Sequence, residues 1–139
     1  MLLEGKRVFL VEDNQGNAAI IQLLLEQDGA KVLRGRWTGD ITSLLSKKMP
    51  LDAILLDLML PHGVTGYDLF DQIRKDSKFD GIPVVAVSAS DPAGAISKVR
   101  KQGFAGFIAK PVNFENFAEQ IATILGGEQV WYTGHNIDV

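Results

Sequence analysis

Asp52-Ala53-Ile54-Leu55-Leu56-Asp57 is the stretch that decides the fold of this chain. Four consecutive apolar residues are typical of a strand buried on both faces, as in a parallel sheet covered by helices. The run stops in a carboxylate, Asp57, and a turn through Leu60-Pro61 follows it. A carboxylate at the end of a buried strand is costly unless something pairs with it. Asp57 is therefore predicted to face a ligand.

Three other apolar runs end in polar side chains of complementary kinds. They are Val8-Phe9-Leu10-Val11 before Glu12-Asp13, Val84-Val85-Ala86-Val87 before Ser88, and Phe107-Ile108-Ala109 before Lys110-Pro111. In a parallel α/β sheet the carboxyl ends of the strands gather along one edge, where such folds bind their ligands. Three acids, one hydroxyl and one amine are predicted to meet there, and we expect them to bind a phosphoryl group.

Strand and helix patterns alternate along the chain, which predicts a parallel sheet with helices on both faces. The expected strands include residues 7–11, 31–34 and 52–57, with two more before Ser88 and Lys110. Helical apolar stripes lie between them and after the last one. Their members are Ala18, Ile21, Leu24 and Leu25; Ile41, Leu44 and Leu45; Leu69, Phe70 and Ile73; and Phe117, Ile121, Ile124 and Leu125, after the N-cap Asn113. A further helix is expected to begin at the N-cap Asp91 and Pro92 and to run to Gly103.

Composition narrows the class of protein. The chain has 139 residues, 46% hydrophobic and 22% charged, which suits one globular domain. Without cysteine it has no disulfide framework, thiol nucleophile or Cys-bound metal. No apolar run approaches membrane-spanning length, and a net charge of -3 without a basic cluster argues against direct nucleic-acid binding. We expect a soluble, cytoplasmic protein with no leader segment.

The motifs at these strand ends resemble a known family. They are Val11-Glu12-Asp13-Asn14, Asp57 followed by Pro61, Ser88-Ala89, Gly103-Phe104-Ala105-Gly106-Phe107 and Lys110-Pro111. In this order they resemble the receiver domain of bacterial two-component response regulators, of the stand-alone, chemotaxis-regulator type. The resemblance covers residues 6–125 and implies a flavodoxin-like, doubly wound sheet of five strands in the order 2-1-3-4-5, with five helices. Residues 1–127 would form the receiver domain and residues 128–139 a C-terminal tail.

The resemblance also implies a role for each site residue. Asp57 would be the phosphoacceptor, forming an aspartyl phosphate. Mg²⁺ would be held by Asp13 and Asp57, by Glu12 mostly through water, and by the backbone carbonyl of Met59. Lys110, joined to Pro111 by a cis bond, and Ser88 would each bind a phosphoryl oxygen. Phe107, at the switch position, would swing toward the strand edge when the Ser88 hydroxyl moves to the phosphoryl group.

Alternatives stay open for several of these residues. Glu12 or Asp13 could serve a helix N-terminus, Lys110 could be a structural ion-pair partner, and Phe107 could be an ordinary core aromatic. Gly66 lies nine positions after Asp57, one more than is usual in the family, so the loop beside the site is longer. Met59 is apolar and offers no hydrogen bond to an attacking water, which predicts slow self-catalysed dephosphorylation.

Three classes of function are compatible with these motifs. The first is a phosphoacceptor that receives its phosphoryl group from a histidine kinase or phosphotransfer protein and signals to a downstream protein effector by contact. The second is a receiver-like scaffold that acts without phosphorylation. The third, an independent enzyme, is disfavoured because a dehalogenase-type phosphatase needs an acid where Met59 stands. The triplet Val130-Trp131-Tyr132 belongs to a loose tail, to a surface that docks on a second copy and gives a homodimer, or to a tail that folds back on the last helix of its own chain.

Overall fold

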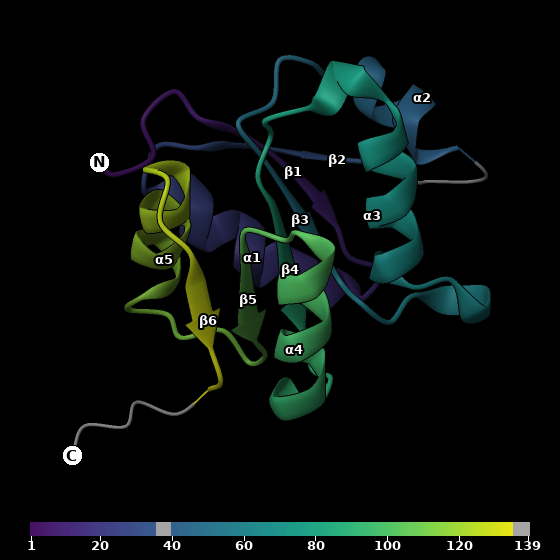
Figure 1. Ribbon diagram of the computed structural model, residues 1–139. Coiled ribbons are helices and arrows are strands. Elements are labelled where there is room, and N and C mark those ends of the chain that lie inside the picture. The colour runs from purple at the N-terminus through teal and green to yellow at the C-terminus, as the bar shows by residue number, and fades with distance from the viewer. Residues whose placement is uncertain (36–39, 135–139) are drawn as a thin grey trace.

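The computed structural model describes residues 1–35 and 40–134. In this part of the chain, six parallel strands form one sheet in the order β2-β1-β3-β4-β5-β6 (Figure 1). The strands are β1 (Arg7–Val11), β2 (Lys31–Arg34), β3 (Ala53–Leu56), β4 (Val84–Ser88), β5 (Gly106–Ala109) and β6 (Val130–Tyr132). The α-helices are α1 (Gln15–Gln27), α2 (Ile41–Ser46), α3 (Gly66–Lys75), α4 (Pro92–Gln102) and α5 (Phe117–Leu125), with 3-10 turns η1 (Pro61–Gly63) and η2 (Ser77–Phe79).

The predicted flavodoxin-like fold is confirmed, but the predicted number of strands is wrong. β1 to β5 follow the expected order 2-1-3-4-5, and Val130–Tyr132 then adds β6 to the outer edge of β5. Trp131 lies opposite Phe107 in this pairing. The physical reason is that β5 would otherwise present an unpaired edge, and the nearby aromatic segment pairs with it. Residues 135–139 of the predicted tail lie outside the described residues.

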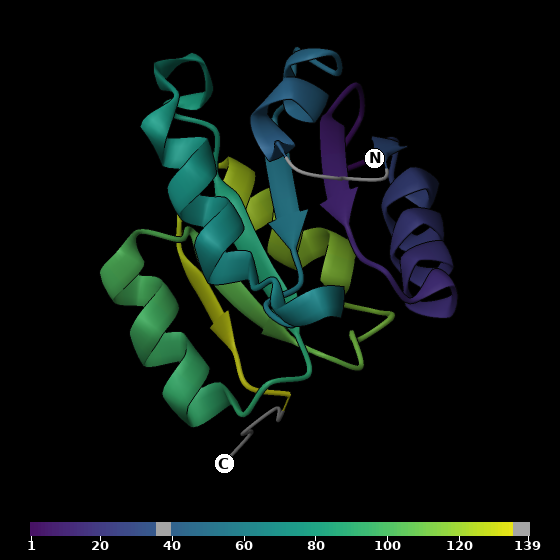
Figure 2. The ribbon, with the colours of Figure 1, turned by 90° about the vertical axis from the view of Figure 1, so that its right-hand side faces the viewer.

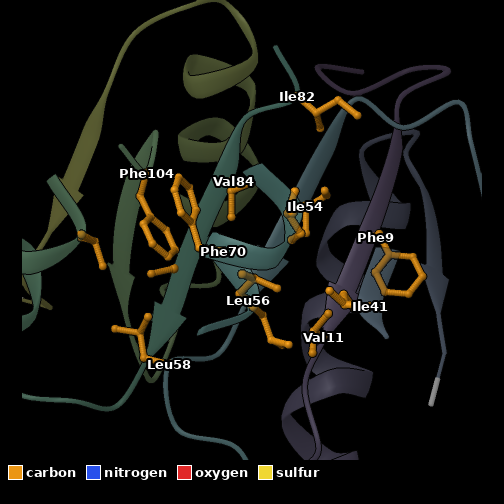
Figure 3. Packing of buried hydrophobic residues seen from close by; sticks show 14 of the residues in the cluster. Phe9, Val11, Ile41, Ile54, Leu56, Leu58, Phe70, Ile82, Val84 and Phe104 are labelled. Atoms are coloured by element: carbon orange, nitrogen blue, oxygen red, sulfur yellow. The ribbon is translucent and has the colours of Figure 1, made fainter. Parts of the chain in front are cut away.

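Two apolar layers cover the two faces of the sheet. Alternate strand residues point to opposite faces, so Phe9 and Ile54 pack with α2, α3 and α4, whereas Val8 and Leu55 pack with α1 and α5. Figure 2 shows α3 and α4 lying over the sheet from a second direction. Many residues of the first layer appear in Figure 3, where the rings of Phe70 and Phe104 stack at 4.4 Å between centroids. No helix of the described residues is long and apolar enough to cross a membrane.

The helix starts hold the loops that follow the strands. Asn14 caps α1 by accepting a hydrogen bond from the backbone N–H of Asn17 at 2.9 Å, and Thr65 caps α3 through Asp68. α4 begins at Pro92 as expected, although the side chain of Asp91 makes no capping bond. Asn113 accepts two backbone N–H groups just before α5, whose assigned first residue is Phe117. These caps fix the chain directly after β1 and β5 and at the end of the loop that follows β3.

Candidate functional site

Carboxylates from two loops meet at the carboxyl edge of the sheet. Glu12 and Asp13 follow β1, and Asp57 follows β3. Each of the three acids offers an oxygen atom, and these oxygens all lie within 4.8 Å of one another. Two ligands on opposite sides of a magnesium ion would be about 4.2 Å apart, at about 2.1 Å from the metal each. The donor set therefore fits Mg²⁺ after small side-chain adjustments, with the remaining positions left to water.

Lys110 reaches the same acids from the end of β5. Its Nζ lies 2.8 Å from Oδ2 of Asp57 and also contacts Oε1 of Glu12. The Lys110-Pro111 bond is cis, as the resemblance to receiver domains implied. Three carboxylates with a single amine leave a net negative charge at the site, which favours a bound cation. The net charge of the site and the spacing of its acids thus both favour a bound divalent cation.

Burial and charge pairing act against each other on the pKa values of this cluster. Burial raises the pKa of Glu12 above its ordinary value, and Lys110 only partly offsets this. For Lys110, burial lowers the pKa, but its hydrogen bonds to Asp57 and Glu12 outweigh burial and raise it. The amine therefore stays charged at neutral pH, close to the carboxylates.

The backbone around Asp57 is held by close contacts. Its N–H donates to the carbonyl of Val11 at 3.1 Å, and its Oδ1 accepts from the N–H of Met59 at 3.1 Å. Met59 pairs with Thr65 in an isolated antiparallel bridge, so the loop folds back on itself. Gly66 then approaches so closely that an added Cβ would lie 2.4 Å from the carbonyl oxygen of Asp57. The longer loop thus still brings the helix glycine against the site.

The hydroxyl of Ser88 has partners of its own. Ser88 ends β4 at the same edge, and its carbonyl accepts from the N–H of Lys110 at 3.0 Å. Its side chain is fully buried, and its Oγ lies 2.9 Å from Oγ of Ser90 while accepting from the Ser90 N–H at 3.2 Å. Among the described residues, no bond joins Ser88 Oγ to the acids or to the amine. The sequence did not predict that Ser90 would be the hydrogen-bonding partner of the Ser88 hydroxyl.

Phe107 and Met59 differ sharply in exposure. Phe107 is completely buried in the apolar layer under α3 and α4, whereas the side chain of Met59 is 65% exposed beside the acids. A buried Phe107 is compatible both with a core residue and with one position of a switch. Its role therefore stays a prediction.

An apolar surface adjoins the amine. Ile20 on α1 and Phe114 after β5 are both exposed, the latter by 67%, and they line a small pocket together with Lys110 and Pro111. Leu23, one turn further along α1, is also exposed. Exposed large apolar side chains gathered beside a polar site indicate a surface for protein contact.

Comparisons with known proteins agree on one family. A family model described as the response regulator receiver domain matches residues 8–122. The polar-differentiation response regulators DivK of Brucella ovis and Brucella anthropi are each 33% identical over 121 residues, which covers 87% of this chain and 97% of theirs. The non-phosphorylated HemR receiver domain of Leptospira biflexa shares 30% identity at a TM-score of 0.70, over 86% of this chain and 94% of that one. A putative response regulator from Chloroflexus aurantiacus, at 24% identity and a TM-score of 0.74 over 87% and 98%, shows the same fold.

Proposed function

This chain belongs to the family of response regulator receiver domains of two-component signalling, and from that premise we propose that Asp57 is its phosphoacceptor. The observation that carries the proposal is the placement of Asp57. Asp57 lies buried directly after β3, its Oδ1 accepts from the N–H of Met59, and the amine of Lys110 lies 2.8 Å from its Oδ2. A nucleophile needs such a fixed position to meet a phosphorus atom in line with the leaving group.

In the reaction, a carboxylate oxygen of Asp57 forms a bond to phosphorus. The bond from phosphorus to the leaving group breaks at the same time, and its electron pair stays with that group. The leaving group is the histidine nitrogen of a donor protein or the acetate of acetyl phosphate. The product on this chain is an aspartyl phosphate.

We propose that Asp13 and Asp57 hold Mg²⁺ directly, Glu12 mostly through water, and the carbonyl of Met59 from the loop. The support is the cluster of hard oxygen ligands within 4.8 Å and the negative charge left after pairing with Lys110. When bound, the cation would neutralise charge that otherwise repels a phosphoryl donor. Asp57 contributes the nucleophile whichever donor is used.

Lys110 and Ser88 are proposed to bind oxygens of the transferred phosphoryl group. Lys110 would act as a point charge, exchanging part of its contact with Asp57 for one with the new group. The Ser88 hydroxyl would donate a hydrogen bond to a phosphoryl oxygen. Phe107, which lies on β5 three residues before Lys110, would then move toward the edge of the sheet. Because both residues lie on or next to β5, a change at the amine can pass along this strand.

The phosphodonor is proposed to be a histidine kinase or a phosphotransfer protein that approaches beside α1. Ile20 and Phe114 provide exposed apolar contacts close to Lys110, so a protein docked there would have its phosphohistidine near Asp57. A downstream protein effector would receive the signal by contact. Nothing observed favours a scaffold that acts without phosphorylation.

Labelling with acetyl phosphate tests the assignment. In Mg²⁺ the purified protein should take up one alkali-labile, hydroxylamine-sensitive phosphoryl group, and EDTA should abolish uptake. Asp57→Asn should remove it, whereas Asp80→Asn, which changes an exposed acid after η2, should not. Equal labelling of Asp57→Asn and the unmodified protein would sink the assignment.

A further inference from the structure

The resting hydrogen bonds of Ser88 are made within its own loop. Its Oγ lies 2.9 Å from Oγ of Ser90 and accepts from the backbone N–H of the same residue at 3.2 Å. Asp57, in contrast, accepts from Met59 and Lys110. Ser90 is thus the sole hydrogen-bonding partner that the described residues give to the Ser88 hydroxyl.

A buried hydroxyl keeps its partners because losing one is costly. Ser88 is fully shielded from water, so its hydroxyl cannot exchange a lost bond for a solvent molecule. To donate to a phosphoryl oxygen on Asp57, the Ser88 hydroxyl must turn away from Ser90. The resting bonds to Ser90 and a bond to the phosphoryl oxygen therefore need different orientations of the Ser88 hydroxyl.

We propose that Ser90 is a positioning residue that holds the Ser88 hydroxyl in its resting orientation and so sets how readily the protein enters its phosphorylated conformation. This inference rests on the proposed function of Asp57. The direction does not depend on which serine donates, because either bond stabilises only the resting orientation. A weaker hold on Ser88 should favour the phosphorylated form.

The size of the effect follows from the bond that is lost. Ser90→Ala removes the hydroxyl but keeps the backbone N–H, so one of the two contacts with Ser88 remains. A net hydrogen-bond contribution of ordinary size corresponds to about a threefold to tenfold change in the equilibrium between the two forms. Ser90→Thr keeps a hydroxyl at the same position and should restore the resting balance.

Binding of beryllofluoride, a tetrahedral mimic of a phosphoryl group, measures this balance without turnover. In Mg²⁺ and monitored by calorimetry, Ser90→Ala should bind the mimic about threefold to tenfold more tightly than the unmodified protein, and Ser90→Thr should bind as the unmodified protein does. In a Ser88→Ala background, Ser90→Ala should have no further effect, because the hydroxyl that it restrains is gone. A purely structural role for Ser90 would not vanish in that background.

The outcomes separate the two proposals. If the unmodified protein and Asp57→Asn bind the mimic equally, or neither binds it, the proposed function fails and this inference fails with it. If the unmodified protein binds it through Asp57 while Ser90→Ala binds equally well or more weakly, the role of Ser90 is refuted and the phosphoacceptor assignment stands. A full Ser90→Ala effect in the Ser88→Ala background would also refute it.

Discussion

Replacing Gly66 with alanine should push the start of α3 away from the end of β3 and destabilise the protein. The added Cβ would lie 2.4 Å from the carbonyl oxygen of Asp57 and 3.0 Å from Cα of Leu58. Both contacts are with backbone atoms, which cannot rotate aside as a side chain can. The contact with Asp57 must open by at least about 0.6 Å before it becomes tolerable. Overpacking of this kind costs about 1–3 kcal/mol.

Urea unfolding of the metal-free protein measures this cost. With a slope of about 2 kcal/mol per molar urea, the midpoint should fall by about 0.5–1.5 M. Gly94→Ala is the matched control, because it adds the same methyl group to α4 where nothing lies within 4 Å. Alanine is the better helix former by up to about 1 kcal/mol, so this midpoint should rise or hold. An unchanged midpoint for Gly66→Ala beside a control that behaves as expected would refute the close approach.

Three further predictions concern the site and the sheet edge. Met59→Asn should shorten the lifetime of the aspartyl phosphate severalfold, because an amide can orient an attacking water; an unchanged or longer lifetime in a phosphate-release assay would contradict this. Glu12, whose pKa burial raises above 4.5, should stabilise the metal-free fold most below pH 4.5 and lose that contribution as pH rises through its folded pKa. Glu12→Gln should flatten this part of a pH series of urea midpoints. A chain ending at Gly127 should be about 2–4 kcal/mol less stable, since the sheet loses the apolar contacts of β6. If this chain and the full chain both sediment as monomers across the micromolar range, the predicted homodimer is wrong.

The geometry of the acid cluster could be anticipated because it depends on strand ends alone. A buried parallel strand fixes the direction of the chain, and the first polar residue after it must lie at the carboxyl edge. Glu12, Asp57 and Lys110 meet there for that reason, although they are far apart in sequence. Such reasoning needs only the apolar runs and their endings. It does not need the loops.

The hydrogen bonding of Ser88 could not be anticipated in the same way. Where a hydroxyl points depends on the turn that follows the strand, and the turn at Ala89 brings Ser90 within reach. The loop after Asp57 gives a second example. Its extra residue could be recognised in the sequence, but not the bridge between Met59 and Thr65, which leaves Gly66 against Asp57. Local tertiary contacts decide both cases.

The edge strand β6 could not be predicted from the pattern of apolar residues. Three residues are too few to show a period that distinguishes a strand from a loop, so the sequence left open whether Trp131 and Tyr132 pack on their own chain or on a second copy. In the structure the cover is intramolecular: Trp131 lies beside Phe107 in the sheet and beneath Arg100 of α4, with 5.1 Å from the guanidinium carbon to the ring centroid. β6 thus contacts both β5 and α4. The match to the family model ends at residue 122, before β6 begins. A partner that approaches this edge therefore meets the backbone of β6 instead of the backbone of β5.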